Sequence, residues 1–123
     1  MIAGLGIDLQ SDSAMDLPWT DPFFRRVFTA GERREAESRG DQAAYCAGRF
    51  AAKEALVKAL GIDTNHVRLN EIETLWNDAG APQLTLSGAL RTLTEDRGIT
   101  GILVSLTHSG GTAAAVVVLT AAE

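Results

Sequence analysis

One long amphipathic segment, residues 43–60, most constrains what this chain can fold into. The pattern fits an uninterrupted helix, and Gly61 follows it as a stop signal. On a helical wheel, Phe50, Val57 and Leu60 gather into one apolar stripe. Such a stripe must be buried against a second layer of structure, and the rest of the chain has to supply that layer.

The other segments carry strand and helix patterns in an irregular order. Strand patterns occupy residues 1–9, 69–76, 83–86, 102–107 and 113–119. Shorter helices are predicted from Pro22, across residues 29–39, where Thr29 and Glu32 have the spacing of a capping box, and between Ser87 and Gly98. A turn at residues 77–80 joins two strands. This order predicts an α+β fold with a small, mostly antiparallel sheet packed against one long helix and shorter helices.

Size and composition indicate one domain, residues 1–123, with 46% hydrophobic and 22% charged residues. A chain of this length can bury a core without a disulfide. No apolar run reaches the roughly 20 residues of a membrane span, and no signal-peptide pattern is present, so no membrane partner is expected. The single cysteine, Cys46, lies in the apolar stripe and suits a reducing cytoplasm. The net charge of −5 disfavours nonspecific nucleic-acid binding.

Two cations on the long helix need an explanation. Arg49 and Lys53 lie one turn apart and repel each other slightly, and Lys53 falls within the apolar stripe. An anionic ligand would relieve the repulsion. Alternatively, both side chains snorkel to water from the edge of the core, and Glu54 forms an ordinary salt bridge with Lys58. The helix alone does not decide between these interpretations.

Two acids and a histidine are the other candidates for chemistry. Asp8 ends an apolar strand, where a carboxylate is costly unless it is paired or bound to a cation. Asp8 either caps a turn or, if the first strand packs beside the long helix, joins Glu54 in binding a hard cation such as magnesium. His108 is either a hydrogen-bonded residue at a strand end or a ligand, and His66 is expected to be exposed. No phosphate loop, dinucleotide fingerprint or zinc spacing occurs.

Four motifs occur in a characteristic order. They are Gly6-Ile7-Asp8-Leu9, Gly48-Arg49-Phe50-Ala51-Ala52-Lys53-Glu54-Ala55-Leu56-Val57-Lys58-Ala59-Leu60-Gly61, Val104-Ser105-Leu106-Thr107-His108 and Ala113-Ala114-Ala115-Val116. In this order they resemble the holo-acyl-carrier-protein synthases, which are small trimeric phosphopantetheinyl transferases. Weaker matches at residues 26–29, 71–73 and 78–82 extend the resemblance over nearly the whole chain. It implies the 4′-phosphopantetheinyl transferase fold.

The resemblance also implies an activity. The enzyme would transfer the 4′-phosphopantetheine arm of coenzyme A to a serine of an apo acyl-carrier protein, giving holo carrier protein and adenosine 3′,5′-bisphosphate. Asp8 and Glu54 match ligands of a magnesium ion that offsets charge on the phosphate. Glu54 or a metal-bound water would accept the serine proton. The family forms homotrimers with sites between subunits.

Further residues match family positions around coenzyme A. Lys58 matches a catalytic lysine near the pyrophosphate, beside the catalytic acids Asp8 and Glu54. Arg49 and His108 match residues around the 3′-phosphate, and Pro82 matches a residue near the adenine. Lys53 belongs to the same signature and is assigned a supporting role in coenzyme binding.

Two departures from the family pattern motivate an alternative function. The family has a basic helix that grips the acidic carrier protein, whereas residues 10–18 contain no cation and only Arg25 and Arg26 follow. Asp63 lies where the family has a glycine-rich loop that approaches phosphate. The alternative is a noncatalytic module that binds coenzyme A or forms a trimeric interaction platform.

Overall fold

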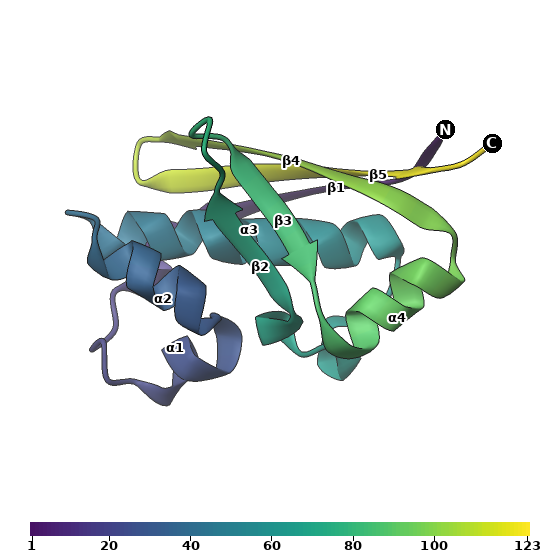
Figure 1. Ribbon diagram of the computed structural model, residues 1–123. Coiled ribbons are helices and arrows are strands. Elements are labelled where there is room, and N and C mark those ends of the chain that lie inside the picture. The colour runs from purple at the N-terminus through teal and green to yellow at the C-terminus, as the bar shows by residue number, and fades with distance from the viewer.

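The long helix α3 (Gln42–Leu60) packs across a three-stranded antiparallel sheet in the computed structural model, which describes residues 1–123 (Figure 1). The sheet has the order β1-β5-β4, so β5 (Thr112–Ala121) is central between β1 (Ile2–Ser11) and β4 (Ile99–Ser109). The Asp41 side chain accepts the N–H of Ala44 at 3.0 Å and caps the start of α3. Gly61 ends the helix in the left-handed conformation.

The other elements cover the opposite side of α3. Strands β2 (Ile72–Trp76) and β3 (Pro82–Leu86) form a separate antiparallel hairpin, which crosses in front of α3 in Figure 1. The helices are η1 (Asp12–Met15), α1 (Pro22–Val27), α2 (Ala30–Glu37), η2 (Thr64–His66), η3 (Leu69–Glu71) and α4 (Gly88–Asp96). The predicted α+β class and the Thr29–Glu32 capping box are confirmed. The strand predicted from residue 69 begins only at Ile72, because η3 occupies the first residues.

Buried apolar side chains form two groups, and α3 contributes to both. The larger group lies between α3, the inner face of the large sheet, the hairpin and α4. The smaller group lies beneath α1 and α2 and includes Cys46, which is buried as predicted. Both faces of α3 are therefore covered, which explains why the alanines in its middle, Ala47, Ala51, Ala52 and Ala55, are all buried.

Strand β1 lies very close to α3 because two of its inward positions are glycines. A Cβ atom on Gly4 would collide with the carbonyl oxygen of Ala59, and one on Gly6 with that of Ala55. Side chains alternate along a strand, so Asp8 follows Gly4 and Gly6 on the inward face. The two glycines therefore bring the Asp8 carboxylate against α3, as a metal site shared with this helix requires.

The outward face of the large sheet is apolar and exposed. Leu5, Ile7 and Leu9 on β1 are 64–69% exposed, and Leu103 on β4 is 62% exposed. Leu5 and Leu103 both lie opposite Val118 of the central strand. Isolated exposed apolar residues are ordinary, but a continuous row across three strands is typical of an interface. None of the helices has the length and hydropathy to cross a membrane.

Candidate active site

Asp8, Glu54 and Lys58 lie together where β1 packs on α3. Lys58 Nζ donates to Asp8 Oδ1 at 2.9 Å and to the carbonyl oxygen of Ile7 at 3.2 Å. The Asp8 side chain is only 14% exposed, whereas the Lys58 side chain is 55% exposed. The salt bridge between Glu54 and Lys58, one of the interpretations left open by the sequence, does not form, because Lys58 pairs with Asp8 on the neighbouring strand. The N-terminal strand does pack beside the long helix, as a shared metal site requires.

The Glu54 carboxylate has no hydrogen-bond partner in this site. Burial raises the pKa of Glu54, the nearby Asp8 carboxylate raises it further, and Lys58 acts in the opposite direction. The two acids thus repel each other in a partly desolvated place, which a divalent cation would relieve. No third His, Cys, Asp or Glu completes the set. A magnesium ion here would take its remaining oxygen ligands from substrate phosphates and water, as this ion commonly does.

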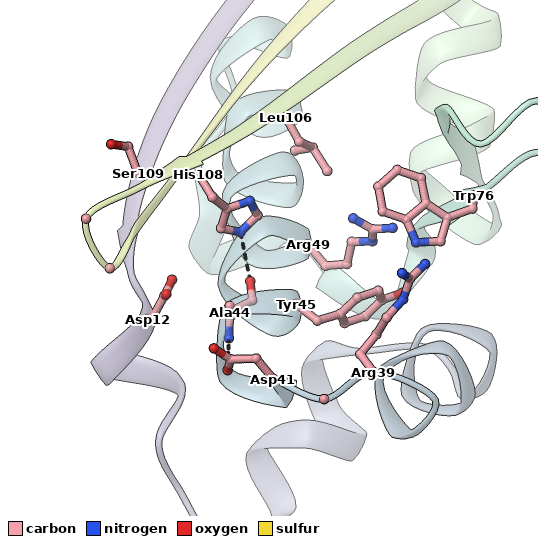
Figure 2. Close-up of a pocket in the computed structure, with 13 residues that line it drawn as sticks. Asp12, Arg39, Asp41, Ala44, Tyr45, Arg49, Trp76, Leu106, His108 and Ser109 are labelled. Atoms are coloured by element: carbon pink, nitrogen blue, oxygen red, sulfur yellow. Dashed lines mark hydrogen bonds between the residues drawn. The ribbon is translucent and has the colours of Figure 1, made fainter.

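His108 lies in a pocket of about 520 Å³ at the other end of α3 (Figure 2). Its Nε2 donates to the carbonyl oxygen of Ala44 at 2.9 Å, because a carbonyl can only accept. Gly48 leaves room for the ring, since a Cβ there would lie 3.0 Å from His108 Cε1. Arg49 lines the same pocket, so the structure brings these two predicted residues together. Asp8, Glu54 and Lys58 do not line it.

Arg49 is buried in this pocket wall, with 2% of its surface exposed. Its Nε donates to the carbonyl oxygen of Thr74 at 2.9 Å, and its Nη2 forms an ion pair with Glu35 at 3.0 Å. The guanidinium lies 4.3 Å from the ring centroid of Tyr45 and 4.6 Å from that of Trp76. Burial, and then the hydrogen bond to Glu35, raise the pKa of the Tyr45 hydroxyl. The charge of Arg49 is therefore neutralised within the protein.

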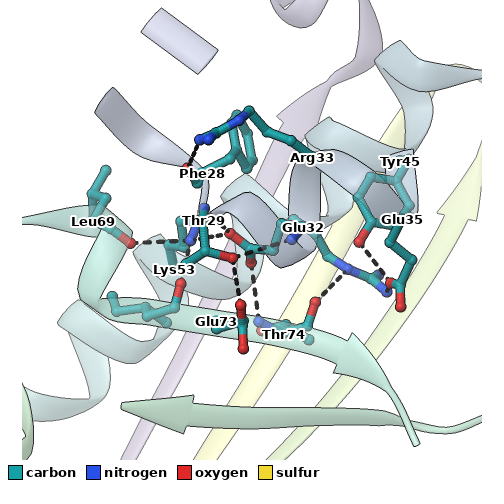
Figure 3. Close-up of polar contacts among 12 residues, drawn as sticks. Phe28, Thr29, Glu32, Arg33, Glu35, Tyr45, Lys53, Leu69, Glu73 and Thr74 are labelled. Atoms are coloured by element: carbon teal, nitrogen blue, oxygen red, sulfur yellow. Dashed lines mark hydrogen bonds and ion pairs between the residues drawn. The ribbon is translucent and has the colours of Figure 1, made fainter. Parts of the chain in front are cut away.

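Lys53 is completely buried with Glu32, and their Nζ and Oε1 atoms are 2.7 Å apart (Figure 3). The ammonium also donates to the carbonyl oxygens of Leu69 and Ile72. Burial lowers the pKa of Lys53, and Glu32 opposes this shift. Of the two interpretations left open, the one in which Arg49 and Lys53 snorkel to water is wrong, because acids of α2 pair with both. Because the Lys53 ammonium is fully buried and engaged by Glu32 and two backbone carbonyls, we assign this residue to the support of α3.

Several residues near the site were not identified as site residues from the sequence. Glu32 and Glu35 have i,i+3 spacing on α2 and face two cations with i,i+4 spacing on α3, a complementary pattern that was available as a signal. Trp76 and Arg39 also line the pocket, but neither belongs to a recognisable sequence motif. Pro82 does not line the pocket, but it lies directly opposite Trp76 in the β2–β3 hairpin. Asp63 is exposed, and its carboxylate accepts the N–H of Asn65 at 2.9 Å.

Known proteins match nearly the whole chain. The family pattern described as the 4′-phosphopantetheinyl transferase superfamily matches residues 4–117. The holo-[acyl-carrier-protein] synthase of Myxococcus xanthus is 44% identical over 122 residues, which cover 96% of this chain and 94% of that protein. The crystal structure of holo-[acyl-carrier-protein] synthase (AcpS) from Neisseria meningitidis superposes with a TM-score of 0.86 at 31% identity, covering 98% and 99% of the two chains. The Chronobacterium ammoniagenes ACPS-CoA complex superposes with a TM-score of 0.81 at 30% identity, covering 98% of each chain.

The fold, the pairing of Asp8 with α3 and the match over residues 4–117 define the class of protein as a 4′-phosphopantetheinyl transferase, which is an enzyme. Sequence identities of 31–44% over nearly the full length of these relatives also identify the family within this class. Within that class, the chain belongs to the holo-acyl-carrier-protein synthase family.

Replacing Lys53 by Met should lower the free energy of unfolding by about 3–5 kcal/mol, because Glu32 would be left buried without its partner. Urea denaturation monitored by circular dichroism measures the change. The double variant Lys53→Met/Glu32→Gln should regain much of the loss. Arg91→Met is the matched control, since its exposed pair with Glu95 should contribute less than about 1 kcal/mol. A Lys53→Met protein as stable as the wild type would contradict the structural role.

Proposed function

We propose that this chain, as a single domain of residues 1–123, transfers the 4′-phosphopantetheine arm of coenzyme A to a serine of an apo acyl-carrier protein. The second product is adenosine 3′,5′-bisphosphate, the cofactor is magnesium, and the compartment is the cytoplasm. The proposal depends on one observation: the carboxylates of Asp8 and Glu54 lie close together beside the half-exposed Lys58. The complex of the Chronobacterium relative with CoA supports coenzyme A as the substrate. Burial raises the pKa of Cys46 to about 12, so this thiol is no competing nucleophile.

The side chains at this site divide the chemistry between them. A bound magnesium ion would supply a Lewis acid for the diphosphate, with Asp8 and Glu54 as its protein ligands. Lys58 donates to Asp8 in the free protein, and its exposed ammonium can turn to a phosphate oxygen of coenzyme A. The carrier serine loses its proton to Glu54 or to a water beside it. The serine oxygen then attacks the phosphorus that carries the pantetheine arm; the new O–P bond forms as the bond from this phosphorus to the bridging diphosphate oxygen breaks, and adenosine 3′,5′-bisphosphate leaves.

We also infer that the active assembly is a homotrimer with its sites between subunits. The exposed apolar row on the outer face of the β1-β5-β4 sheet supports self-association. Within one chain, the pocket of Arg49 and His108 is not lined by Asp8, Glu54 or Lys58. A coenzyme A molecule that contacts both groups therefore fits best between two chains. This division of the site supports assembly independently of the apolar row.

The carrier protein is proposed to dock on a groove between α1 and the segment after η2. Arg26 and Arg68 are exposed, and neither side chain forms an ion pair or hydrogen bond. They flank Val27, Val67 and Leu69 in a groove of about 440 Å³. Two uncompensated cations beside apolar side chains suit an acidic amphipathic helix of a carrier protein. This groove would replace the basic helix that residues 10–18 do not provide.

The alternative is a noncatalytic module that binds coenzyme A or mediates trimeric interactions. The segment without cations favours it, because η1 in this segment carries Asp12 and buries Met15 in place of a basic docking surface. Asp63, the second departure, does not favour it, since its carboxylate caps η2 locally. Incubation with coenzyme A, magnesium and a panel of apo carrier proteins distinguishes the two functions. Binding of coenzyme A without transfer to any carrier would favour the module.

Replacing Glu54 by Gln should abolish transfer while leaving the fold intact. The substitution removes one carboxylate ligand and also the repulsion with Asp8, so the unfolding temperature without metal should not fall. Mass spectrometry of the carrier detects the added phosphopantetheine arm, and a thermal shift with magnesium reports metal binding. Glu95→Gln, an exposed acid on α4, should keep both signals. Full transfer by Glu54→Gln would remove this residue from the metal site.

Reversing the charges of Arg26 and Arg68 to Glu should slow carrier modification by about tenfold or more at low salt. The difference should narrow at high salt, because exposed charges are screened. Initial rates at several salt concentrations measure both effects, and the KM for coenzyme A should not change. Arg34→Glu on α2 serves as the control, since it is exposed and lies outside the groove. An unchanged rate in the double variant would place docking elsewhere.

Sedimentation equilibrium should give a mass three times the 13.0 kDa of the chain. Leu103→Asp should produce monomers without transfer activity, because it places a charge in the apolar row on β4. Its own fold should persist, since Leu103 is 62% exposed in the monomer. A wild-type monomer that transfers the arm at full rate would contradict the shared site.

A further inference from the structure

In the structure, Lys58 engages one of the acids of the proposed metal site. Its ammonium donates to Asp8 Oδ1 at 2.9 Å and to the carbonyl oxygen of Ile7 at 3.2 Å. No other group donates a hydrogen bond to the Asp8 carboxylate. An ammonium and a hard divalent cation seek the same partners, because both bind carboxylate oxygens through their charge. Lys58 therefore competes with any cation that Asp8 and Glu54 would share.

The charges at this site do not balance while Lys58 is its only cation. One ammonium faces the carboxylates of Asp8 and Glu54, so one negative charge remains uncompensated. A divalent cation would neutralise both acids, and the ammonium of Lys58 would then be surplus positive charge. Surplus charge of this kind is unfavourable beside a metal ion until an anion arrives, because like charges repel at short range. The diphosphate of coenzyme A is such an anion.

Lys58 is the partner that can move. Its side chain is 55% exposed, whereas the side chain of Asp8 is only 14% exposed. An ammonium on a flexible four-carbon stem can redirect its donors by side-chain rotation alone. Asp8 lies on β1, and the glycines at positions 4 and 6 hold this strand close against α3. Release of Lys58 from Asp8 therefore requires no movement of the backbone, and a half-exposed ion pair is weak enough to be exchanged.

We propose that Lys58 takes the place of the metal ion at Asp8 in the free protein, and that it leaves Asp8 for the diphosphate of coenzyme A when magnesium binds. This inference rests on the proposed function. The exchange makes the binding of magnesium and of coenzyme A cooperative, because each ligand weakens the hold of Lys58 on Asp8. By linkage, each ligand then raises the affinity for the other by the same factor. The acids are thereby kept from binding magnesium tightly before the coenzyme is present.

The release of Lys58 can be observed directly, because the chain contains only two lysines, Lys53 and Lys58. In protein labelled with carbon isotope at lysine, magnesium should shift the ε-methylene NMR signal of Lys58 and increase its mobility in relaxation measurements, because two hydrogen bonds are lost. Lys53 is an internal control, since it is buried with Glu32 and its signal should not change. Magnesium binding to the wild-type protein without a change in the mobility of Lys58 would overturn the proposal.

Metal affinity tests the competition without coenzyme A or carrier protein. Lys58→Met keeps an apolar stem but removes the charge, so the Kd for Mn²⁺, which prefers the same oxygen ligands as magnesium, should fall by about fivefold or more. Electron paramagnetic resonance of the free Mn²⁺ measures this Kd. Arg91→Met, which removes an exposed cation on α4, should keep the wild-type Kd. A Kd for Lys58→Met that equals or exceeds the wild-type value would contradict the competition.

The same titration with coenzyme A present measures the coupling. Coenzyme A should tighten Mn²⁺ binding by a larger factor in the wild-type protein than in Lys58→Met, because only the wild type has an ammonium to withdraw from Asp8. Equal factors in the two proteins would sink the exchange. Failure of the proposed function gives a different result: Mn²⁺ binding to the wild type that Glu54→Gln does not weaken would mean that these acids hold no metal.

Discussion

The rest of the structure depends on two ion pairs between α2 and α3, which join Glu32 to Lys53 and Glu35 to Arg49. Removing charges from water is costly, so these side chains can be buried only when acid and cation meet. The pairs fix the rotation of α3 about its own axis. Glu54 follows Lys53 by about 100° around the helix axis and therefore faces β1, on which Asp8 lies. The catalytic face of α3 is thus set by contacts on another face.

The sequence predicted the architecture well because the signals for it are local. The apolar stripe, the capping box of Thr29 and the glycine stop at Gly61 each depend only on residues close in sequence, and α3 begins and ends within one residue of its predicted bounds. The buried ion pairs join residues 14 and 21 positions apart, so the matching spacing of the acids and cations becomes informative only once α2 is known to pack on α3. The meaning of Gly4 and Gly6 likewise depends on α3 being their neighbour.

The candidate site was predictable only where it coincides with motifs. Asp8, Glu54 and Lys58 lie in the conspicuous blocks and do come together, but the partner of Lys58 is the distant Asp8 and not the nearby Glu54. Trp76 ends β2, Arg39 lies two residues beyond the end of α2, and they meet across 37 positions of sequence. Such a contact leaves no periodicity, so only the three-dimensional arrangement connects it to Arg49 and the pocket.

The positions of the arginines that have no ion-pair partner explain how an acidic chain can bind anionic ligands. The net charge is −5, yet most cations of α3 and α4 are committed to internal pairs. Uncommitted arginines remain at the His108 pocket and beside the α1 groove. A ligand responds to the local field and not to the sum over the chain, because charges beyond about 10 Å are screened. Internal pairing therefore separates the arginines that stabilise the fold from those available to a phosphate or an acidic partner.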